Sequence, residues 1–194
     1  MNFGDLKTDI LSLIGRAPNT VVYDLVIADV NADVRIPEMM ASTSVTEAAS
    51  VSTGVSNLLE IQAAWRDTTE AWPLTVTSLD AIKAEYSSSG NPTQVAHLDG
   101  TLYFNAPGNS ETVQIRYYAA LSEFSSDADE NDVLTKFPAV FVYGALAHHG
   151  DLIGDSRAPA WRSIYEREVR KANRYGTKNR FGGAPLRPTP RVVD

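Results

Sequence analysis

The sequence predicts an α+β protein with terminal helices forming a helical bundle, an inserted antiparallel β-rich domain and an extended C-terminal arm. Apolar residues recur at helical spacing near both ends, whereas the middle alternates apolar and polar residues as half-buried strands do. The last residues are rich in proline, glycine and positive charge. The predicted division is a helical core domain from residues 1–33 and 133–176, a β-rich insertion at 34–124, an acidic linker at 125–132, and an extended basic arm at 177–194.

Two helices are predicted at the N-terminal end. The first spans residues 2–15, because Asn2 is a good N-cap, an apolar stripe follows, and Gly15 can end the helix. The second spans about 21–32, with Asn19 or Thr20 as its cap. Because β-branched residues favour strands, a strand is the alternative for this segment, but we favour the helix.

Strands are predicted through the middle of the chain. Residues 40–57 are rich in Ser, Thr, Val and Ala without a helical period and suit strands and loops. An Asp99-Gly100 pair between two apolar runs predicts a tight hairpin, because both residues accept the positive φ angles of such a turn. The other predicted elements are strands at 58–65, 72–77 and 112–118 and one short helix over residues 78–86 capped by Ser78.

The C-terminal third contains the strongest helical pattern. Residues 134–175 read as one helix with Pro138 in its first turn, a break at Gly154-Asp155-Ser156, and a longer basic helix. Beyond Tyr175 the prolines and glycines argue against a helix, so we expect an extended arm.

Composition limits the classes of protein that the chain can represent. Its 194 residues are 43% hydrophobic and 21% charged, as in folded globular proteins. The chain has no cysteine, which excludes disulfides, thiolate metal sites and thiol catalysis. The N-terminus lacks the apolar core of a signal peptide, and no stretch approaches the roughly 20 apolar residues of a membrane span.

Charge is distributed unevenly along the chain. The net charge is −7, yet residues 156–194 hold ten Lys/Arg and only three Asp/Glu. The first 155 residues therefore hold seven Lys/Arg and twenty-one Asp/Glu. A basic end on an acidic body predicts an acidic partner for that end, which could be nucleic acid, a neighbouring subunit or another protein.

No constellation of catalytic, cofactor-binding or metal-ligating residues emerges. His148 and His149 stand near Asp151 and Asp155, but adjacent helical residues point about 100° apart, and two ligands on one side are too few for a metal. The sequence has no nucleophile elbow and no phosphate-binding loop with its strand and helix. We therefore expect a protein that is not an enzyme and needs no cofactor.

The basic residues near the C-terminus are the candidate functional site. Four of them lie at helical spacing on one side of the last helix, and the rest follow along the arm with two apolar residues. The alternative is a solvated face paired with Glu166 and Glu168. The candidate protein interface comprises Arg167, Arg170, Lys171, Arg174, Lys178, Arg180, Phe181, Leu186, Arg187 and Arg191.

An ordered set of short motifs over a little under half of the chain resembles the phage adaptor proteins of tailed bacteriophages. The set begins with a proline, a strand and an Asp-Gly turn, continues with paired aromatics, and ends in the last two helices. Its members are Pro92, Val95–Gly100, Leu102-Tyr103-Phe104, Pro107, Tyr117-Tyr118, Leu121-Ser122, Leu134, Phe137-Pro138, Tyr143-Gly144-Ala145-Leu146, Asp155, Arg157, Trp161 and Tyr165.

This resemblance implies a structural virion protein at the head–tail junction, assembled in the host cytoplasm. Twelve copies would form a ring between the portal protein and a downstream tail or nozzle protein. Genomic DNA would pass through the ring without sequence-specific binding, and no membrane would be involved. Two alternatives remain: a small DNA-binding or packaging accessory protein that uses the basic helix and tail, and an enzyme whose site the sequence does not reveal.

Overall fold

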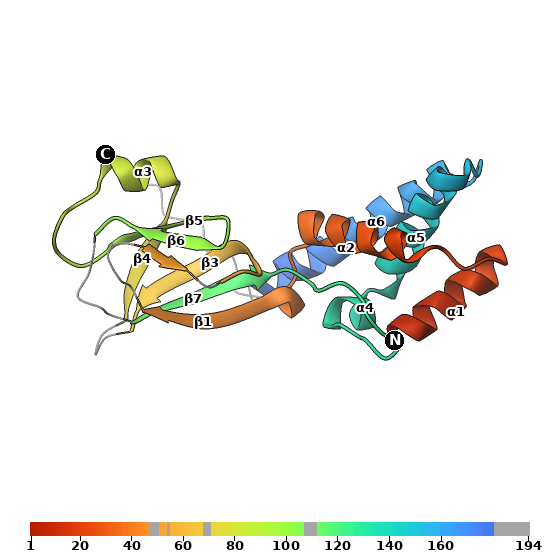
Figure 1. Cartoon of the computed structure of the whole chain (residues 1–194), viewed down its shortest axis with the longest axis horizontal. Helices are drawn as coiled ribbons and strands as arrows, with labels where there is room; N and C mark the ends of the chain where they lie inside the picture. Colours follow the sequence, from red (N-terminus) through yellow and green to blue (C-terminus); the bar gives the residue numbers. More distant parts are fainter. Residues whose placement is uncertain (47–50, 54, 68–70, 107–111, 181–194) are drawn as a thin grey trace, which may run out of the picture.

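The computed structural model describes residues 1–46, 51–53, 55–67, 71–106 and 112–180, and it confirms the predicted α+β class. Figure 1 shows an elongated molecule with a helical part at one end and a curved sheet at the other. The helical elements are α1 (Phe3–Ile14), α2 (Thr20–Asp33), η1 (Pro37–Met39), α3 (Leu79–Ala84), α4 (Asp132–Lys136), α5 (Pro138–Ile153) and α6 (Ala158–Arg180). The strands are β1 (Met40–Thr46), β2 (Val51–Thr53), β3 (Leu58–Arg66), β4 (Trp72–Val76), β5 (Gln94–Leu98), β6 (Thr101–Phe104) and β7 (Thr112–Ala119).

Both predicted N-terminal helices are present. Asn2 caps α1 through a capping box in which its side chain accepts from the Asp5 N–H and the Asp5 carboxylate accepts from the Asn2 N–H. Gly15 ends α1 with a φ of 69°. The segment from Thr20 is a helix rather than the alternative strand, because five buried residues of α2 pack into the helical core.

The predicted cap of α2 is only half correct. Asn19 occupies the N-cap position, but its side chain makes no capping hydrogen bond. Instead the Thr20 hydroxyl donates to Asn19 Oδ1 over 3.1 Å, which occupies the oxygen that would otherwise cap the helix.

The β-rich region folds as one curved sheet. Across the described strands the order is β1-β7-β3-β4-β5-β6-β2. The predicted hairpin is confirmed, with positive φ angles of 48° at Asp99 and 73° at Gly100. The prediction that the whole sheet is antiparallel is wrong for one pair of strands. β4 and β5 are parallel, because the chain between them crosses over through α3 instead of turning back in a hairpin.

The molecule has two hydrophobic cores that meet at β7. Val113, Ile115 and Tyr117 lie in the core of the sheet, as their alternation predicts. Tyr118, which is 1% exposed, points to the opposite side of the strand and lies in the core of the helical part. Two neighbouring residues of one strand thus belong to different cores.

The C-terminal helices follow the predicted order, but the first is divided into two and the last extends further than predicted. Phe137 and Pro138 separate α4 from α5, Pro138 begins α5, and Gly154 ends it in the left-handed conformation. The expectation of an extended arm from residue 177 is wrong for residues 177–180, which continue α6 to Arg180. Residues 181–194 of the predicted arm lie outside the described residues.

Close packing at Gly176 explains why α6 passes through a glycine. A Cβ at this position would lie 2.6 Å from the backbone oxygen of Arg35. Residues from Asp33 to Ile36 therefore approach the helix backbone directly. This contact stabilises the turn of α6 around Gly176, where the low helix propensity of glycine would otherwise disfavour a helix.

Candidate functional site

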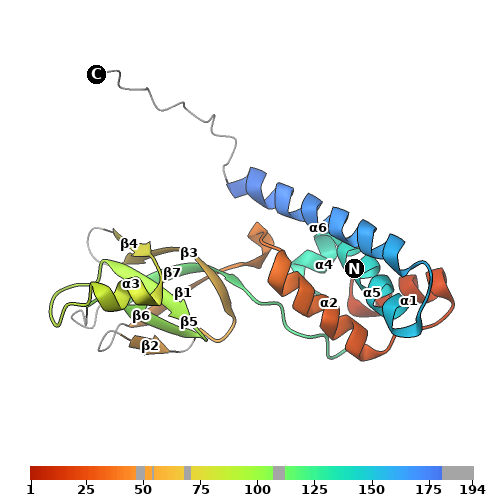
Figure 2. The same cartoon turned by 90° about the horizontal axis from the view of Figure 1, so that it is seen from above.

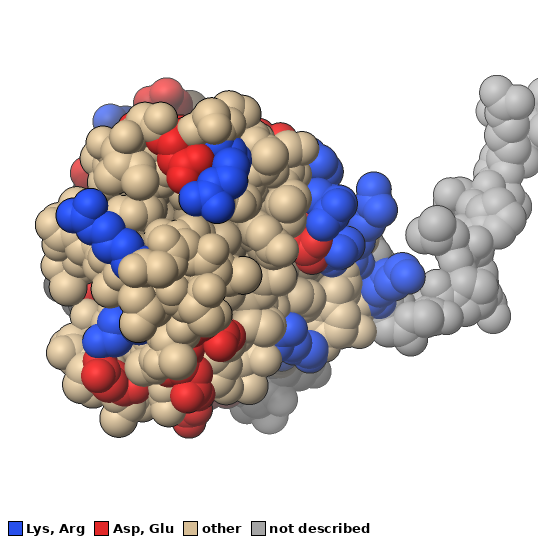
Figure 3. Space-filling view, turned by 90° about the vertical axis from the view of Figure 1, so that its right-hand side faces the viewer, with Lys and Arg blue, Asp and Glu red and all other residues tan. Residues whose placement is uncertain are grey.

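The predicted basic stripe lies on the exposed side of α6. Tyr165, Val169, Ala172 and Gly176 form the buried side of this helix, so residues between them in the helical projection face solvent. The exposed basic residues are Arg167, Arg170, Lys171, Arg174 and Lys178. Figure 2 shows α6 running along one edge of the helical part, and the end-on view in Figure 3 shows Lys and Arg side chains gathered on that side.

Three of these basic side chains pair with glutamates of the same helix. Arg167 Nε lies 3.2 Å and Lys171 Nζ 2.7 Å from Glu168 Oε1, and Arg170 lies 3.8 Å from Glu166. The hydrogen bond from Lys171, together with that from Arg167, lowers the pKa of Glu168. These are the pairs of the solvated-face alternative, and exposed pairs of this kind contribute only about 0–1 kcal/mol each.

Arg174 and Lys178 differ from the other three. Neither makes an ion pair within the described residues. Both line a shallow hollow of about 440 Å³ together with Arg170, Asn173 and Thr177. A surface hollow bordered by uncompensated cations is suited to an acidic partner, so this end of α6 is the part of the predicted site that the structure favours most.

The hollow rests on a well-anchored helix end. The Asn173 side chain accepts from the Arg35 N–H over 2.9 Å and donates to the Asp33 carbonyl over 2.8 Å. Two residues further along, the Tyr175 hydroxyl donates to Glu38 over 3.0 Å, and Lys136 bonds to both groups. These contacts fix the position and direction of the basic face relative to the chain that leads into the sheet.

Electrostatics strengthens this anchor. Burial opposes ionisation of Glu38, but hydrogen bonds from Lys136, from its own backbone and from Tyr175 outweigh burial and lower the pKa of Glu38. The hydrogen bond to Glu38 in turn raises the pKa of Lys136. Both groups therefore stay charged at neutral pH. Sequence reasoning missed this ion pair because its two residues are 98 positions apart in the chain.

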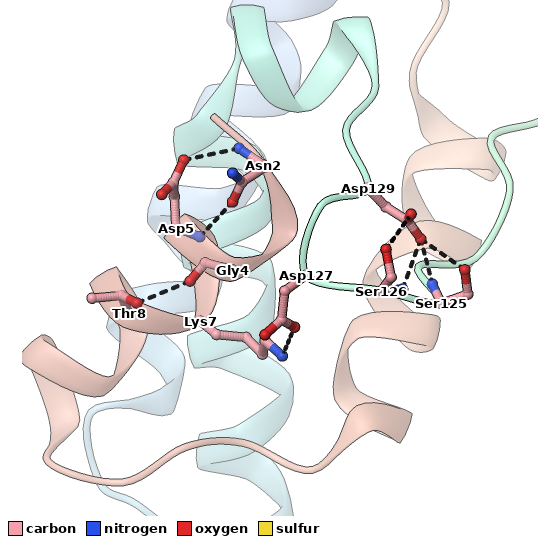
Figure 4. Close-up of polar contacts among 9 residues, drawn as sticks. All are labelled: Asn2, Gly4, Asp5, Lys7, Thr8, Ser125, Ser126, Asp127 and Asp129. Carbon is pink, nitrogen blue, oxygen red and sulfur yellow. Dashed lines mark hydrogen bonds and ion pairs between the residues drawn. The ribbon is translucent and has the colours of Figure 1, made fainter.

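The segment predicted as an acidic linker is a folded turn on α1. Figure 4 shows the Asp129 carboxylate accepting hydrogen bonds from the backbone and hydroxyl groups of Ser125 and Ser126, at 2.6 to 2.9 Å. These bonds, led by the Ser125 N–H, hold the pKa of Asp129 well below its usual range. Lys7 pairs with Asp127, and the Asp129 carbonyl accepts from the Phe3 N–H over 2.8 Å. The acidic residues here organise the chain locally.

The histidine pair divides between two environments. His148 Nε2 lies 2.8 Å from an Asp29 oxygen and so links α5 to α2. His149 is 6% exposed, and its Nε2 has no hydrogen-bond partner in the described part of the chain. Among the described residues no group of three His, Cys, Asp or Glu side chains could hold a metal ion.

Sequence reasoning missed an exposed apolar stripe on α2. Val21, Leu25, Ala28 and Ala32 recur at i, i+4, i+7 and i+11 and face solvent, while the opposite side of α2 is buried in the core. The signal was present in the sequence, because α2 carries apolar residues on two opposite sides, separated by Asp24 on one flank and by Asp29 and Asp33 on the other. A surface helix of a monomer normally keeps its outer side polar, so this stripe is a second candidate interface.

Four of the ten predicted interface residues cannot be placed. Phe181, Leu186, Arg187 and Arg191 lie outside the described residues, and Arg180 is the last residue of α6. The other five lie on one face of α6. The sequence predicted this for Arg167, Arg170, Lys171 and Arg174 but assigned Lys178 to the extended arm.

A protein-family model matches almost the whole chain. The family model described as SU10 adaptor protein matches residues 1–189, which include both the helical part and the sheet. No curated protein matches the chain. Within the described residues, none of the helices combines the length and the apolar character that crossing a bilayer requires.

Proposed function

This chain belongs to the SU10 adaptor protein family, a family of phage adaptor proteins, and from that premise we propose that it joins the head of a tailed bacteriophage to its tail. The observation that carries this proposal is the extent of the match, residues 1–189. The family is structural, and we propose that this chain likewise performs no catalysis.

The proposed working form is a ring of twelve copies between the portal protein and a downstream tail or nozzle protein, located in the virion. Contacts between two different surfaces of identical subunits repeat around an axis and close into rings, and the chain offers two different exposed faces on α2 and α6. The copy number comes from the resemblance to adaptor proteins. The helical part would form the ring wall, and the sheet would lie at its periphery or contact the tail protein.

Genomic DNA is proposed to pass through this ring without being read. The first 155 residues hold twenty-one acidic and seven basic residues, so this part of the chain has a net negative charge, the same sign as DNA. Like charge discourages the phosphate backbone from adhering during ejection, because non-specific DNA binding depends on neutralising phosphates with Lys and Arg.

The basic end of the chain is proposed as the attachment to an acidic partner, either the portal or a neighbouring subunit. Arg174 and Lys178 support this role, because they border a hollow and make no ion pair among the described residues. The arm beyond Arg180 adds Arg187 and Arg191, with Phe181 and Leu186 as apolar anchors.

Deleting the gene for this chain from the phage tests the function. The expected result is full-length tails, or tail parts, and separate heads that never join, and plasmid-borne expression of the chain should restore joined particles. Normal joining of heads and tails without the chain would contradict the proposal.

The same basic face supports a second candidate function, that of a DNA-binding or packaging accessory protein. The affinity of the purified chain for duplex DNA, measured between 50 and 200 mM salt, distinguishes the two functions. A protein that makes 6–10 phosphate contacts loses about 10³–10⁵-fold in affinity over this range. Tight binding with such a loss would favour the accessory protein, whereas weak binding at all salt concentrations favours the adaptor.

A further inference from the structure

Two helices of the helical part, α2 and α6, present exposed faces with the same spacing and opposite character. The α2 outer face consists of Val21, Leu25, Ala28 and Ala32. The α6 outer face consists of Arg167, Lys171, Arg174 and Lys178. Each set follows the i, i+4, i+7, i+11 pattern of one straight helix face.

The α2 outer face is apolar and flanked only by acidic charge. Val21 is 53% and Leu25 40% exposed, which leaves much of each side chain in water. Asp24 borders the stripe on one side and Asp29 and Asp33 on the other, and Thr20–Asp33 contains no Lys or Arg. Asp29 lies 2.8 Å from His148 Nε2, whereas Asp24 and Asp33 make no ion pair within the described residues.

The α6 outer face is chemically complementary to it. Lys and Arg side chains carry long aliphatic stems that cover apolar surface while the charged head remains at the edge. Stems from Arg174 and Lys178 can therefore lie on Leu25 and Ala28 while their heads reach Asp24 or Asp33. The hollow of about 440 Å³ beside Arg174 offers room for an apolar side chain of a partner.

The arrangement of the helices prevents this contact within one copy. α5 packs against both α2 and α6, and each of the two helices turns its buried side inward. Figure 2 shows α6 along one edge of the helical part, with α2 as a separate helix below it in this view. The outer face of each helix lies opposite its buried side and therefore away from the core. The two faces can meet only between different copies of the chain.

We propose that the α2 outer face of one copy packs against the α6 outer face of the next. The inference rests on the proposed ring and assigns the surfaces that form it. Each copy uses two different faces, so the contact is heterologous and repeats around a closed ring. It also explains why α2 is apolar on both sides and why the last helix is basic on the side that faces away from the core.

Engineered disulfides test this contact directly, because the chain has no cysteine of its own. The test variants combine Leu25→Cys with either Arg170→Cys or Arg174→Cys, which covers two positions along α6. The matched control combines Leu98→Cys with Arg174→Cys. Leu98 lies on the sheet, and its side chain is 48% exposed. Each variant is co-expressed with the portal protein of the same phage, oxidised, and separated by size under denaturing, non-reducing conditions.

The contact predicts a ladder of trimers and larger products from at least one test variant. Each single-cysteine variant, and the control with Leu98→Cys and Arg174→Cys, should give no more than traces of disulfide-linked dimer. A control ladder as strong as that of the test variants, or no test ladder although rings form on the portal, would overturn the contact and leave the adaptor function standing. Recovery of the unsubstituted chain as monomers that never associate with portal rings would overturn both.

Charge exchange provides an independent readout in the same association assay. Asp24→Lys and Arg174→Glu each place like charges in the contact and should raise the concentration needed for half-assembly by about tenfold or more. The two substitutions together in one chain restore opposite charges at every contact and should recover most of the loss. Additive losses in the double variant would overturn the proposal.

Discussion

The side-chain amide of Asn31 holds the backbone of Leu121 through two hydrogen bonds. Asn31 Oδ1 accepts from the Leu121 N–H over 2.7 Å, and Asn31 Nδ2 donates to the Leu121 carbonyl over 3.1 Å. Asn173 makes the same pair of bonds to the Arg35 N–H and the Asp33 carbonyl. Both chain segments that connect the helical part to the sheet are therefore held to a helix by an asparagine side chain.

Replacing Asn31 with Ala should destabilise the fold. The substitution leaves two half-buried backbone groups of Leu121 without partners, which costs about 1–3 kcal/mol each where water cannot reach them. Urea unfolding should show a lower transition midpoint. Asn179→Ala, on the exposed side of α6, is the matched control and should change stability by less than about 0.5 kcal/mol. Equal effects of the two variants would show that the amide contact contributes nothing.

Gly176→Ala should destabilise the protein even though Ala favours helices by about 1 kcal/mol over Gly. The new Cβ would lie 2.6 Å from the Arg35 oxygen, so the backbone that leads into the sheet must move. The expected net loss is about 1–3 kcal/mol in thermal or urea unfolding. Thr177→Ala, an exposed neighbour, should be nearly neutral. A stabilised Gly176→Ala protein would mean that this close approach does not occur.

Acid should weaken the turn at residues 125–129. The pKa of Asp129 is held well below its usual range by hydrogen bonds from Ser125 and Ser126, so the unfolded chain binds this proton more readily than the folded one. The stability that these bonds confer is present above about pH 4 and is lost progressively as the pH falls below that value.

Asp129→Asn removes this titration and should flatten the decline of the unfolding temperature between about pH 4 and pH 2, while lowering that temperature at pH 7. Asp9→Asn, an exposed substitution on α1, should leave the shape of the profile unchanged. Parallel profiles for Asp129→Asn and the unsubstituted protein would contradict the assignment.

Ending the chain after Arg180 should leave the fold intact and weaken attachment to the portal. Among the described residues the last member of the hydrophobic cores is Ala172, so we expect the unfolding temperature to change little. Binding of the shortened chain to isolated portal rings should fall, and Arg187→Glu with Arg191→Glu in the full chain should reproduce part of that loss. Undiminished portal binding by both variants would rule out a role for the arm.

Local patterns accounted for the elements that the sequence predicted correctly. The Asn2 cap, the Asp99-Gly100 turn and the break at Gly154 each depend on a few neighbouring residues and on backbone preferences that hold in any fold. The basic face of α6 was likewise visible from spacing alone.

Long-range contacts decided the features that the sequence did not reveal. α6 continues past Gly176 because a segment about 140 residues earlier packs on it, as the bond from Asn173 to Asp33 shows. The parallel pairing of β4 with β5 depends on the crossover through α3. The α2 outer face could not be identified from the sequence alone, because α2 has two apolar sides and only the structure shows which one is buried.

Electron microscopy of purified phage particles tests the adaptor function most directly. A reconstruction of the head–tail junction should show a closed ring of this chain between portal and tail, with α2 of each copy against α6 of the next and DNA in the lumen. A junction fully accounted for by other proteins, or this chain found only inside the capsid on DNA, would contradict the adaptor assignment.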